Sequence, residues 1–292
     1  MPSPSPSPGK RLRTLLKNGI VIAPGAYDAL SARLARQAGA KAVYMTGFGI
    51  SGSLLGAPDL GLVTASEMAD RVRALAASCA PVPLIADGDN GHGGVLNAER
   101  LTRAYEQAGA ACIQIEDQLT PKRCGHMEDK QILPLAEAVA KIRAVAAARA
   151  SKDFCILART DARAVEGLKG ALKRGEAFLK AGADILFIEA PRSEKELRAV
   201  ADTFKGVPLV ANMVEDGKTP FHDAAVLADM GYRIALFPVS ALLRVSATLA
   251  DTYAGLLKRG TPPEGRRFTF AQYNEAVGLG AALARAKRFD GQ

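Results

Sequence analysis

The chain has 292 residues, of which 48% are hydrophobic and 23% are charged, which suits one large folded domain or two small ones. The net charge of +8 does not point to nucleic acid, because acidic residues intersperse the basic ones and there is no Trp for base stacking. No apolar stretch is long enough to span a bilayer, and the start lacks the apolar core of a signal peptide. We expect a cytoplasmic protein that binds neither nucleic acid nor membrane.

In chain order, residues 1–9 alternate Pro and Ser and are expected to form a disordered leader. Eight runs of aliphatic and β-branched residues then predict strands, at 20–22, 42–45, 83–86, 112–115, 155–157, 185–188, 208–211 and 234–237. Helical spacing of apolar residues lies between them, at 28–37, 66–77, 98–107, 135–148, 171–180, 194–204 and 222–230. Strands that alternate with helices predict a parallel sheet.

Four of the helix ends share one signal, a glycine that a left-handed C-cap favours, at Gly39, Gly109, Gly182 and Gly231. Eight such units in roughly 240 residues favour a closed barrel over a doubly wound sheet, which typically has fewer strands and a glycine-rich phosphate turn. We therefore predict an α/β fold, a (β/α)8 TIM barrel over residues 10–259.

Beyond the eighth strand, residues 241–257 are predicted to be helical and the Gly260-Thr-Pro-Pro263 segment breaks the helix. Residues 273–288 predict a further amphipathic helix, so we expect a C-terminal helical extension over 260–292. A minimal barrel does not need this helix, which is expected to pack on another surface such as a second subunit.

Polar residues follow the predicted strands at their carboxyl ends, where barrel enzymes hold their active sites. Asp87, Asp89 and Glu116 offer oxygen ligands without His or Cys, a set that suits Mg²⁺ better than zinc. A lone Asp-x-Asp pair is often only a solvated turn, but the convergence of several strand ends favours a metal site. Arg159 could clamp a substrate carboxylate, or instead form a structural ion pair with Glu189 or Asp161.

A loop after the fourth strand carries Cys124 between two cations and a histidine, in the segment Lys122-Arg-Cys-Gly-His126. These neighbours favour the thiolate and tune the thiol for proton transfer, and Gly125 gives the loop freedom to close. The other cysteines, Cys79, Cys112 and Cys155, are expected in the core. His92 either lines the site or punctuates a flexible loop, and His222 is expected as a surface or helix-capping residue.

Together these motifs resemble the isocitrate lyase and phosphoenolpyruvate mutase superfamily, and within it the short lyases typified by methylisocitrate lyase and 2,3-dimethylmalate lyase. The resemblance runs from Pro24 to about Arg259. It rests on Tyr44-Met-Thr-Gly47, Pro58-Asp-Leu-Gly61, Asp87-Gly-Asp89, Ile115-Glu-Asp-Gln118, Lys122-Arg-Cys-Gly-His126, Ala158-Arg-Thr-Asp-Ala162 and Glu189-Ala190.

The resemblance implies a role for each matching residue. It implies Mg²⁺, for which Mn²⁺ could substitute, held by Asp59, Asp87, Asp89 and Glu116. It implies that Cys124 protonates the departing carbanion, with Lys122, His126, Arg159 and Glu189 as further catalytic residues. It implies substrate contacts from Tyr44, Thr46, Gly47, Asp87, Gly125, His126, Arg159 and Asn212. Homotetramers, assembled as dimers of dimers with a swapped C-terminal helix, are also implied.

The implied function is a Mg²⁺-dependent lyase that cleaves a small 2-hydroxy di- or tricarboxylate, of the 2-methylisocitrate or 2,3-dimethylmalate type, into a 2-oxo acid and a second carboxylate. The alternatives are a carboxyvinyl-carboxyphosphonate or phosphoenolpyruvate mutase, an oxaloacetate hydrolase or decarboxylase, and a non-catalytic barrel that binds an anion. Mutases and decarboxylases of this superfamily generally lack the Cys-Gly-His segment. Asn90 and His92 depart from the usual lyase pattern, as does the segment Met127-Glu-Asp-Lys130.

Overall fold

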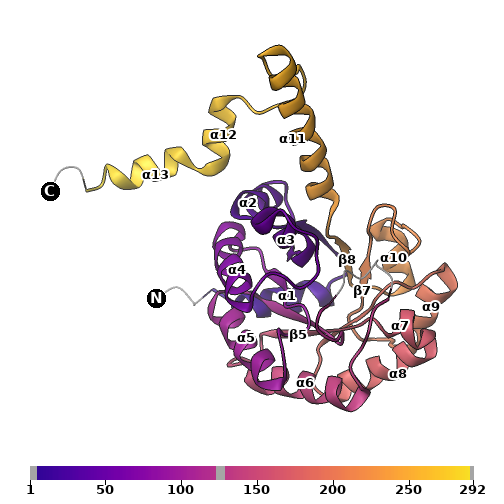
Figure 1. The fold of residues 1–292 in the computed structure, drawn as a ribbon. Helices are drawn as coiled ribbons and strands as arrows, with labels where there is room; N and C mark the ends of the chain where they lie inside the picture. The colour runs from indigo at the N-terminus through magenta and orange to yellow at the C-terminus, as the bar shows by residue number, and fades with distance from the viewer. Residues whose placement is uncertain (1–4, 123–128, 290–292) are drawn as a thin grey trace. The chain divides into compact units, whose positions relative to one another are not determined.

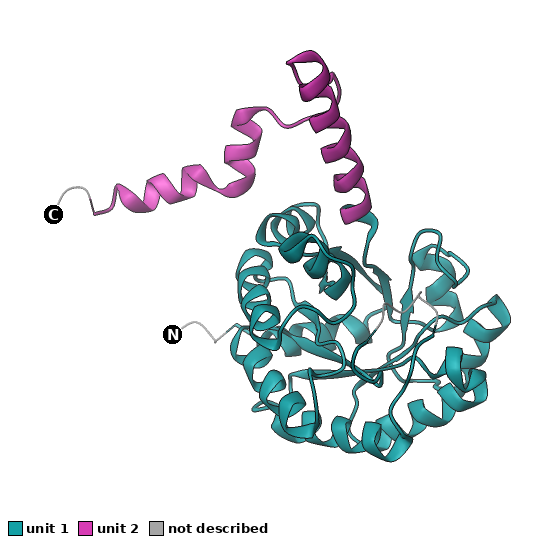
Figure 2. Cartoon of the chain, viewed as in Figure 1, with its two compact units in different colours: residues 1–241 teal, residues 242–292 magenta. Residues whose placement is uncertain are grey.

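The computed structural model describes residues 5–122 and 129–289 of the chain. Cys124, Gly125 and His126, for which the sequence predicts catalytic and substrate-binding roles, lie outside the described residues. The chain divides into two compact units, residues 1–241 and 242–292 (Figure 2). This division lies at the start of the long helix that follows the eighth strand, whereas the sequence placed the boundary after residue 259.

The first unit is a barrel of eight parallel strands surrounded by helices (Figure 1). Its strands run in the order β6-β5-β4-β3-β2-β1-β8-β7, and a parallel bridge between Leu186 and Leu209 joins the two ends of the sheet. They are β1 (Val21–Ala26), β2 (Val43–Met45), β3 (Leu84–Asp87), β4 (Cys112–Glu116), β5 (Cys155–Thr160), β6 (Ile185–Ile188), β7 (Val210–Asn212) and β8 (Ile234–Phe237). The predicted (β/α)8 barrel is confirmed.

Seven helices of the barrel coincide with those predicted from apolar spacing: α2 (Ala29–Gln37), α4 (Ala65–Cys79), α5 (Val95–Gln107), α6 (Leu135–Ala148), α8 (Gly167–Lys180), α9 (Glu194–Thr203) and α10 (Ala224–Met230). The four glycines predicted after helix ends, at positions 39, 109, 182 and 231, all have positive φ between 91° and 108°. A side chain at these turns would be strained, which explains the repeated glycine.

Three helices of this unit were not predicted: α1 (Pro8–Lys17), α3 (Gly47–Leu55) and the short α7 (Ala162–Val165). Helix α1 overlaps the last two residues of the expected leader, because Ser7 caps it by accepting a hydrogen bond from the Lys10 N–H. Its residues Leu12 and Leu16 are buried in the core cluster formed by the strands. Cys79, Cys112 and Cys155 are buried, as predicted.

The second unit contains most of α11 (Ser240–Arg259), followed by α12 (Phe270–Val277) and α13 (Leu279–Ala286). The single helix predicted over 273–288 is interrupted at Gly278, whose φ of 84° ends α12 in a left-handed cap. Among the described residues of this unit only Gly255 and Ala276 are buried. None of the helices in the described part of the chain is both long and apolar enough to cross a membrane.

Candidate active site

The predicted site residues that the structure describes gather at the carboxyl ends of the barrel strands. They lie on or after the six strands β2 to β7, and all of them are buried: Tyr44, Thr46, Gly47, Asp59, Asp87, Asp89, Glu116, Lys122, Arg159, Glu189 and Asn212. The barrel therefore brings together residues that lie up to 168 positions apart in the sequence.

Asp87 is held in place by hydrogen bonds from β4 and from the loop that follows β3. Its Oδ1 accepts hydrogen bonds from the Gln114 amide at 3.1 Å and from the Asp89 N–H at 3.0 Å. Gln114 in turn accepts a hydrogen bond from the Tyr44 hydroxyl, at 3.2 Å. Burial and the neighbouring Asp89 charge raise the pKa of Asp87 to about 6. A carboxylate with such a raised pKa favours the arrival of a cation.

Helix α3 begins beside this carboxylate, and its first residue has to be glycine. The Gly47 N–H donates to Asp87 Oδ2 at 3.2 Å, while the Thr46 hydroxyl caps the helix by accepting from the Gly49 N–H at 3.4 Å. A Cβ atom at Gly47 would lie 2.9 Å from Asp87 Oδ2 and 3.0 Å from Asp89 Oδ1. The N-terminal end of α3 is also a favourable place for an anionic group.

The Lys122 amine lies between two of the predicted metal ligands. Its Nζ is 2.5 Å from Asp59 Oδ1 and 2.6 Å from Asp89 Oδ1, and the side chain is 5% exposed. Burial works against the charged amine, but the carboxylates around it, Asp89 and Asp59 first, raise the pKa of Lys122 well above its usual value. The protein therefore places one positive charge among these carboxylates.

The oxygen donors at this end of the barrel fit a hard divalent cation. Glu116 Oε1 is buried and accepts no hydrogen bond from the described residues, and the buried Asp89 Oδ1 contacts the Lys122 amine at 2.6 Å. Burial also raises the pKa of Glu116 well above its usual value, so the charged carboxylate gains from a nearby cation. Within the described ranges, no three His, Cys, Asp or Glu side chains already form a metal-ligand group. The Lys122 amine takes the space between Asp59 and Asp89 instead.

Arg159, at the end of β5, is the cation of the neighbouring half of the site. Its Nε lies 3.4 Å from Glu116 Oε2 and its Nη2 lies 3.3 Å from Glu189 Oε2. The Asn212 amide donates to the same Glu189 carboxylate at 3.3 Å. These contacts join the predicted metal ligands to the residues expected on the other half of the substrate.

Arg159 also forms the structural ion pair that the sequence left open. Its guanidinium donates from Nε and Nη2 to the two oxygens of Asp161, at 3.0 Å and 3.1 Å, and lies 5.1 Å from the centre of the Phe187 ring. Burial acts to raise the pKa of Asp161, but Arg159 and Lys130 outweigh it and lower that pKa. The fork of Arg159 is therefore fixed in orientation.

Several supporting residues were missed from the sequence. Asp117 accepts from the Thr160 hydroxyl at 2.6 Å and the Asp161 N–H at 2.9 Å, and the buried Arg174 lies 3.2 Å from it. Lys130 donates to Asp161 at 2.7 Å. The sequence could have indicated Gln114, because it is a polar residue within the otherwise apolar strand run 112–115. Nothing in the sequence marks Arg174, which lies on a helix, as a residue that supports the site.

Two of the residues that depart from the usual lyase pattern, Asn90 and His92, lie on the β3–α5 loop. The Asn90 amide donates to the Gln118 carbonyl at 3.3 Å and to the Thr120 hydroxyl at 2.9 Å, so it ties this loop to the segment leading toward Cys124. His92 lines the site, with Nε2 at 3.8 Å from Asp89 Oδ2. His222 does not cap α10, because Asp223 provides the capping carboxylate.

Known proteins similar to this chain include both lyases and a mutase. A family model described as phosphoenolpyruvate phosphomutase matches residues 12–257. The chain is 43% identical over 272 residues to 2,3-dimethylmalate lyase of Eubacterium barkeri, covering 92% of this chain and 93% of that protein. It is 44% identical to 2-methylisocitrate lyase of Bacillus subtilis, with coverage of 84% and 80%. It is 41% identical to chloroplastic carboxyvinyl-carboxyphosphonate phosphorylmutase of Arabidopsis thaliana, with coverage of 91% and 80%.

Solved structures of similar proteins superpose on nearly the whole chain. A crystal structure of 2,3-dimethylmalate lyase, described as a member of the PEP mutase/isocitrate lyase superfamily, has a TM-score of 0.94 and 36% identity, covering 99% of this chain and 97% of that one. Oxaloacetate acetylhydrolase in complex with 3,3-difluorooxalacetate has a TM-score of 0.94 and 34% identity, with 98% of each chain covered.

Proposed function

Since the chain belongs to the phosphoenolpyruvate phosphomutase family, we propose that it is a carbon–carbon lyase acting on a small 2-hydroxy di- or tricarboxylate. The substrate is of the 2,3-dimethylmalate or 2-methylisocitrate type, and the products are a 2-oxo acid and a second carboxylate. One observation carries this proposal: at the carboxyl end of the barrel, a cluster of buried carboxylates lies beside the Arg159 guanidinium, whose orientation is fixed by Asp161. Family membership agrees with the resemblance seen in the sequence.

Mg²⁺ is the cofactor we assign to this site, with Mn²⁺ as a substitute, and Asp59, Asp87, Asp89 and Glu116 as the residues that would hold it. Their carboxylate oxygens are hard ligands, and the buried Glu116 Oε1 accepts no hydrogen bond from the described residues, so this set suits such an ion. When bound, the ion would act as a Lewis acid that stabilises negative charge on the 2-oxo acid.

The substrate carboxylate of the 2-oxo acid half is assigned to the N-terminal end of α3 and to Arg159. Thr46 and Gly47 begin that helix, where backbone N–H groups favour an anion, and Tyr44 lies on the strand before them. Arg159 offers a planar fork whose orientation Asp161 fixes. The second half of the substrate is assigned to Glu189 and Asn212, which contact each other beyond Arg159.

The proposed reaction needs one base and one acid. A base removes the proton of the substrate hydroxyl, the C–C bond breaks as the carbonyl forms, and the electron pair of that bond stays on the departing carbanion. We assign the acid that protonates this carbanion to the Cys124 thiol, with Lys122, Gly125 and His126 in the same loop. The buried position of Lys122 between Asp59 and Asp89 supports the placement of this loop over the site.

A mutase is the second candidate, because the Arabidopsis phosphorylmutase is nearly as similar to this chain as the lyases are. An oxaloacetate hydrolase is a further candidate, supported by the superposition on oxaloacetate acetylhydrolase. The segment Cys124-Gly-His126 favours the lyase, since migration of a phosphoryl group requires no thiol acid.

The test is an assay of the purified chain with Mg²⁺ on 2,3-dimethylmalate, 2-methylisocitrate, isocitrate, oxaloacetate and phosphonopyruvate. We expect pyruvate release from one of the first two substrates, loss of that release with EDTA, and a fall of about 10²- to 10⁴-fold in the Cys124→Ser variant. Turnover of phosphonopyruvate alone would overturn the lyase proposal, and pyruvate release that persists in EDTA would overturn the metal assignment.

A second copy of this chain is the partner we propose for the helices of the second unit, in line with the expected homotetramer. Their apolar residues Leu249, Tyr253, Leu257, Phe270 and Leu283 are between 45% and 89% exposed. So much exposed apolar surface on adjacent helices indicates a protein interface. Light scattering should give a mass near four chains, and a monomer at micromolar concentration would contradict this proposal.

A further inference from the structure

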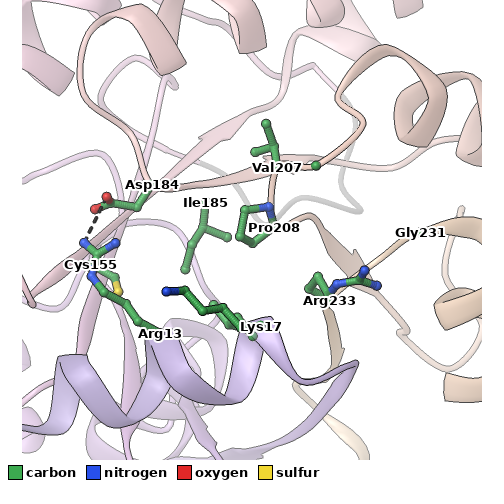
Figure 3. Close-up of a pocket in the computed structure, with 11 residues that line it drawn as sticks. Arg13, Lys17, Cys155, Asp184, Ile185, Val207, Pro208, Gly231 and Arg233 are labelled. Atoms are coloured by element: carbon green, nitrogen blue, oxygen red, sulfur yellow. Dashed lines mark ion pairs between the residues drawn. The ribbon is translucent and has the colours of Figure 1, made fainter.

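A cavity of about 510 Å³ lies at the opposite end of the barrel from the candidate active site, where the strands begin. Helix α1 forms one wall and the segments that lead into β5, β6, β7 and β8 form the others. Figure 3 shows the Lys17 side chain between Arg13 on one side and Arg233 on the other. The volume falls within the range of about 300–1,000 Å³ found for small-molecule sites.

Basic residues outnumber acidic residues in the lining of this cavity. Arg13, Lys17 and Arg233 line it together with one carboxylate, Asp184, which leaves a net charge of +2. Asp184 is already paired with Arg13 at 2.9 Å and with Arg149 at 2.7 Å. Neither Lys17 nor Arg233 has a carboxylate within ion-pair distance in the described part of the chain. Both cations are thus available to an anion.

The rest of the lining is apolar and offers no reactive group. Leu16, Ile185, Val207 and Pro208 supply hydrocarbon surface beside the cations. The Cys155 thiol also lines the cavity, but burial raises its pKa to about 12, so it is not a nucleophile at neutral pH. The cavity is therefore suited to binding and not to covalent chemistry.

We propose that this cavity binds a small organic phosphate monoester. The dianionic phosphate would pair with Lys17 and Arg233, since its charge matches the net charge of the lining, and the organic part would contact Leu16, Ile185 and Pro208. The proposal does not depend on the lyase activity, because none of the lining residues belongs to the candidate active site.

Phenyl phosphate is the probe for this site, titrated calorimetrically into the full chain in EDTA so that no metal is bound. We expect saturable binding that weakens at least tenfold in the double variant Lys17→Gln and Arg233→Gln. Neither side chain lies in the core, so the double variant is expected to fold, and its thermal unfolding checks this. Benzoate, with one negative charge, is expected to bind more weakly than phenyl phosphate.

The matched control is Lys41→Gln, which removes an exposed lysine just before β2, at the same end of the barrel but outside the cavity lining. It should bind phenyl phosphate as the unaltered chain does. Equal affinity of the unaltered chain and the double variant would place the binding elsewhere, for example at Arg159, and would overturn the proposal. A loss of affinity in Lys41→Gln as large as in the double variant would overturn it too, because it would reflect net charge alone.

Discussion

The two ends of the barrel handle charge in opposite ways. At the carboxyl end, acidic residues and Arg159 are buried and held by several hydrogen bonds each, as Asp87 and Asp161 illustrate. At the amino end, the basic residues that line the cavity outnumber the acidic ones. They remain partly open to solvent, as the 32% exposure of the Arg13 side chain illustrates. Burial makes charged groups interact strongly and fixes their geometry, whereas exposure allows them to be screened.

Strand β5 carries this contrast within six residues. It begins at Cys155, whose thiol is kept neutral by burial beside the basic cavity, and ends near Arg159, whose charge is fixed among three carboxylates. The same strand therefore contributes to the basic cavity at one end and to the candidate active site at the other. Variants of Arg159 at the carboxyl end and of Arg13 at the amino end test whether this difference in burial decides how much each arginine contributes to stability and activity.

The largest effect is expected for Arg159→Gln. The variant loses the fork assigned to the substrate carboxylate and leaves Glu116, Asp161 and Glu189 without their shared cation. We expect kcat/KM for pyruvate release to fall by about 10²- to 10³-fold, and the free energy of unfolding to fall by about 3–5 kcal/mol.

The conservative variant Arg159→Lys separates these two effects, measured by steady-state kinetics and urea unfolding. The lysine retains the charge and so recovers part of the stability, but it cannot reproduce the bidentate geometry, and kcat/KM should stay low. An Arg159→Lys variant with unimpaired activity would show that charge alone, without the fork, is needed at this position.

The next effect concerns pH and Asp161. Its pKa is lower in the folded chain than in the unfolded one, so its contribution to stability is fully present above the unfolded value of about 3.9 and is lost as the pH falls below it. Urea unfolding of Asp161→Asn should therefore show a deficit of about 3 kcal/mol at pH 7 that shrinks toward pH 3. A deficit that is constant with pH would mean that the aspartate acts through packing and not through its charge.

Much of the fold could be predicted because apolar runs alternate so regularly with helical spacing. All eight strands were located, but β1 and β5 are both clearly longer than expected, because β1 continues through Pro24 and Gly25 and β5 continues through Arg159 to Thr160. Helix α3 was missed because its sequence, GFGISGSLL, has three glycines and little helical signal. It forms because Thr46 caps it and because Gly47 fits beside Asp87, which are tertiary contacts that no sequence pattern displays.

The site residues at strand ends could be predicted from the barrel and the resemblance together, but not their supporting contacts. Arg174 lies on α8, far from any motif, and its pairing with Asp117 depends on how the helix packs. The place of Lys122 between Asp59 and Asp89 was equally hidden, because the loop path sets it. The roles of Cys124, Gly125 and His126 stay predictions.

A smaller effect, confined to the carboxyl end, is expected for Gly47→Ala. The added Cβ would lie 2.9 Å from Asp87 Oδ2 and would push that carboxylate out of position. We expect Mg²⁺ affinity, measured by calorimetry, to fall by about tenfold. Gly52→Ala is the matched control in the same helix, since nothing lies within 4 Å of its added Cβ. Equal affinity of the two variants would show that Asp87 is not a metal ligand, or that it can move without loss.

The smallest effect is expected for Arg13→Gln, the counterpart of Arg159→Gln at the amino end. Arg13 donates to the Asp153 carbonyl at 2.9 Å and pairs with Asp184, but Asp184 keeps Arg149 as a second cation at 2.7 Å. No carboxylate is left alone, so the free energy of unfolding should fall by only about 1–2 kcal/mol, and kcat/KM should not change. If Arg13→Gln were as destabilising as Arg159→Gln, burial would not be what separates the two arginines, and the amino end would be as rigidly organised as the site.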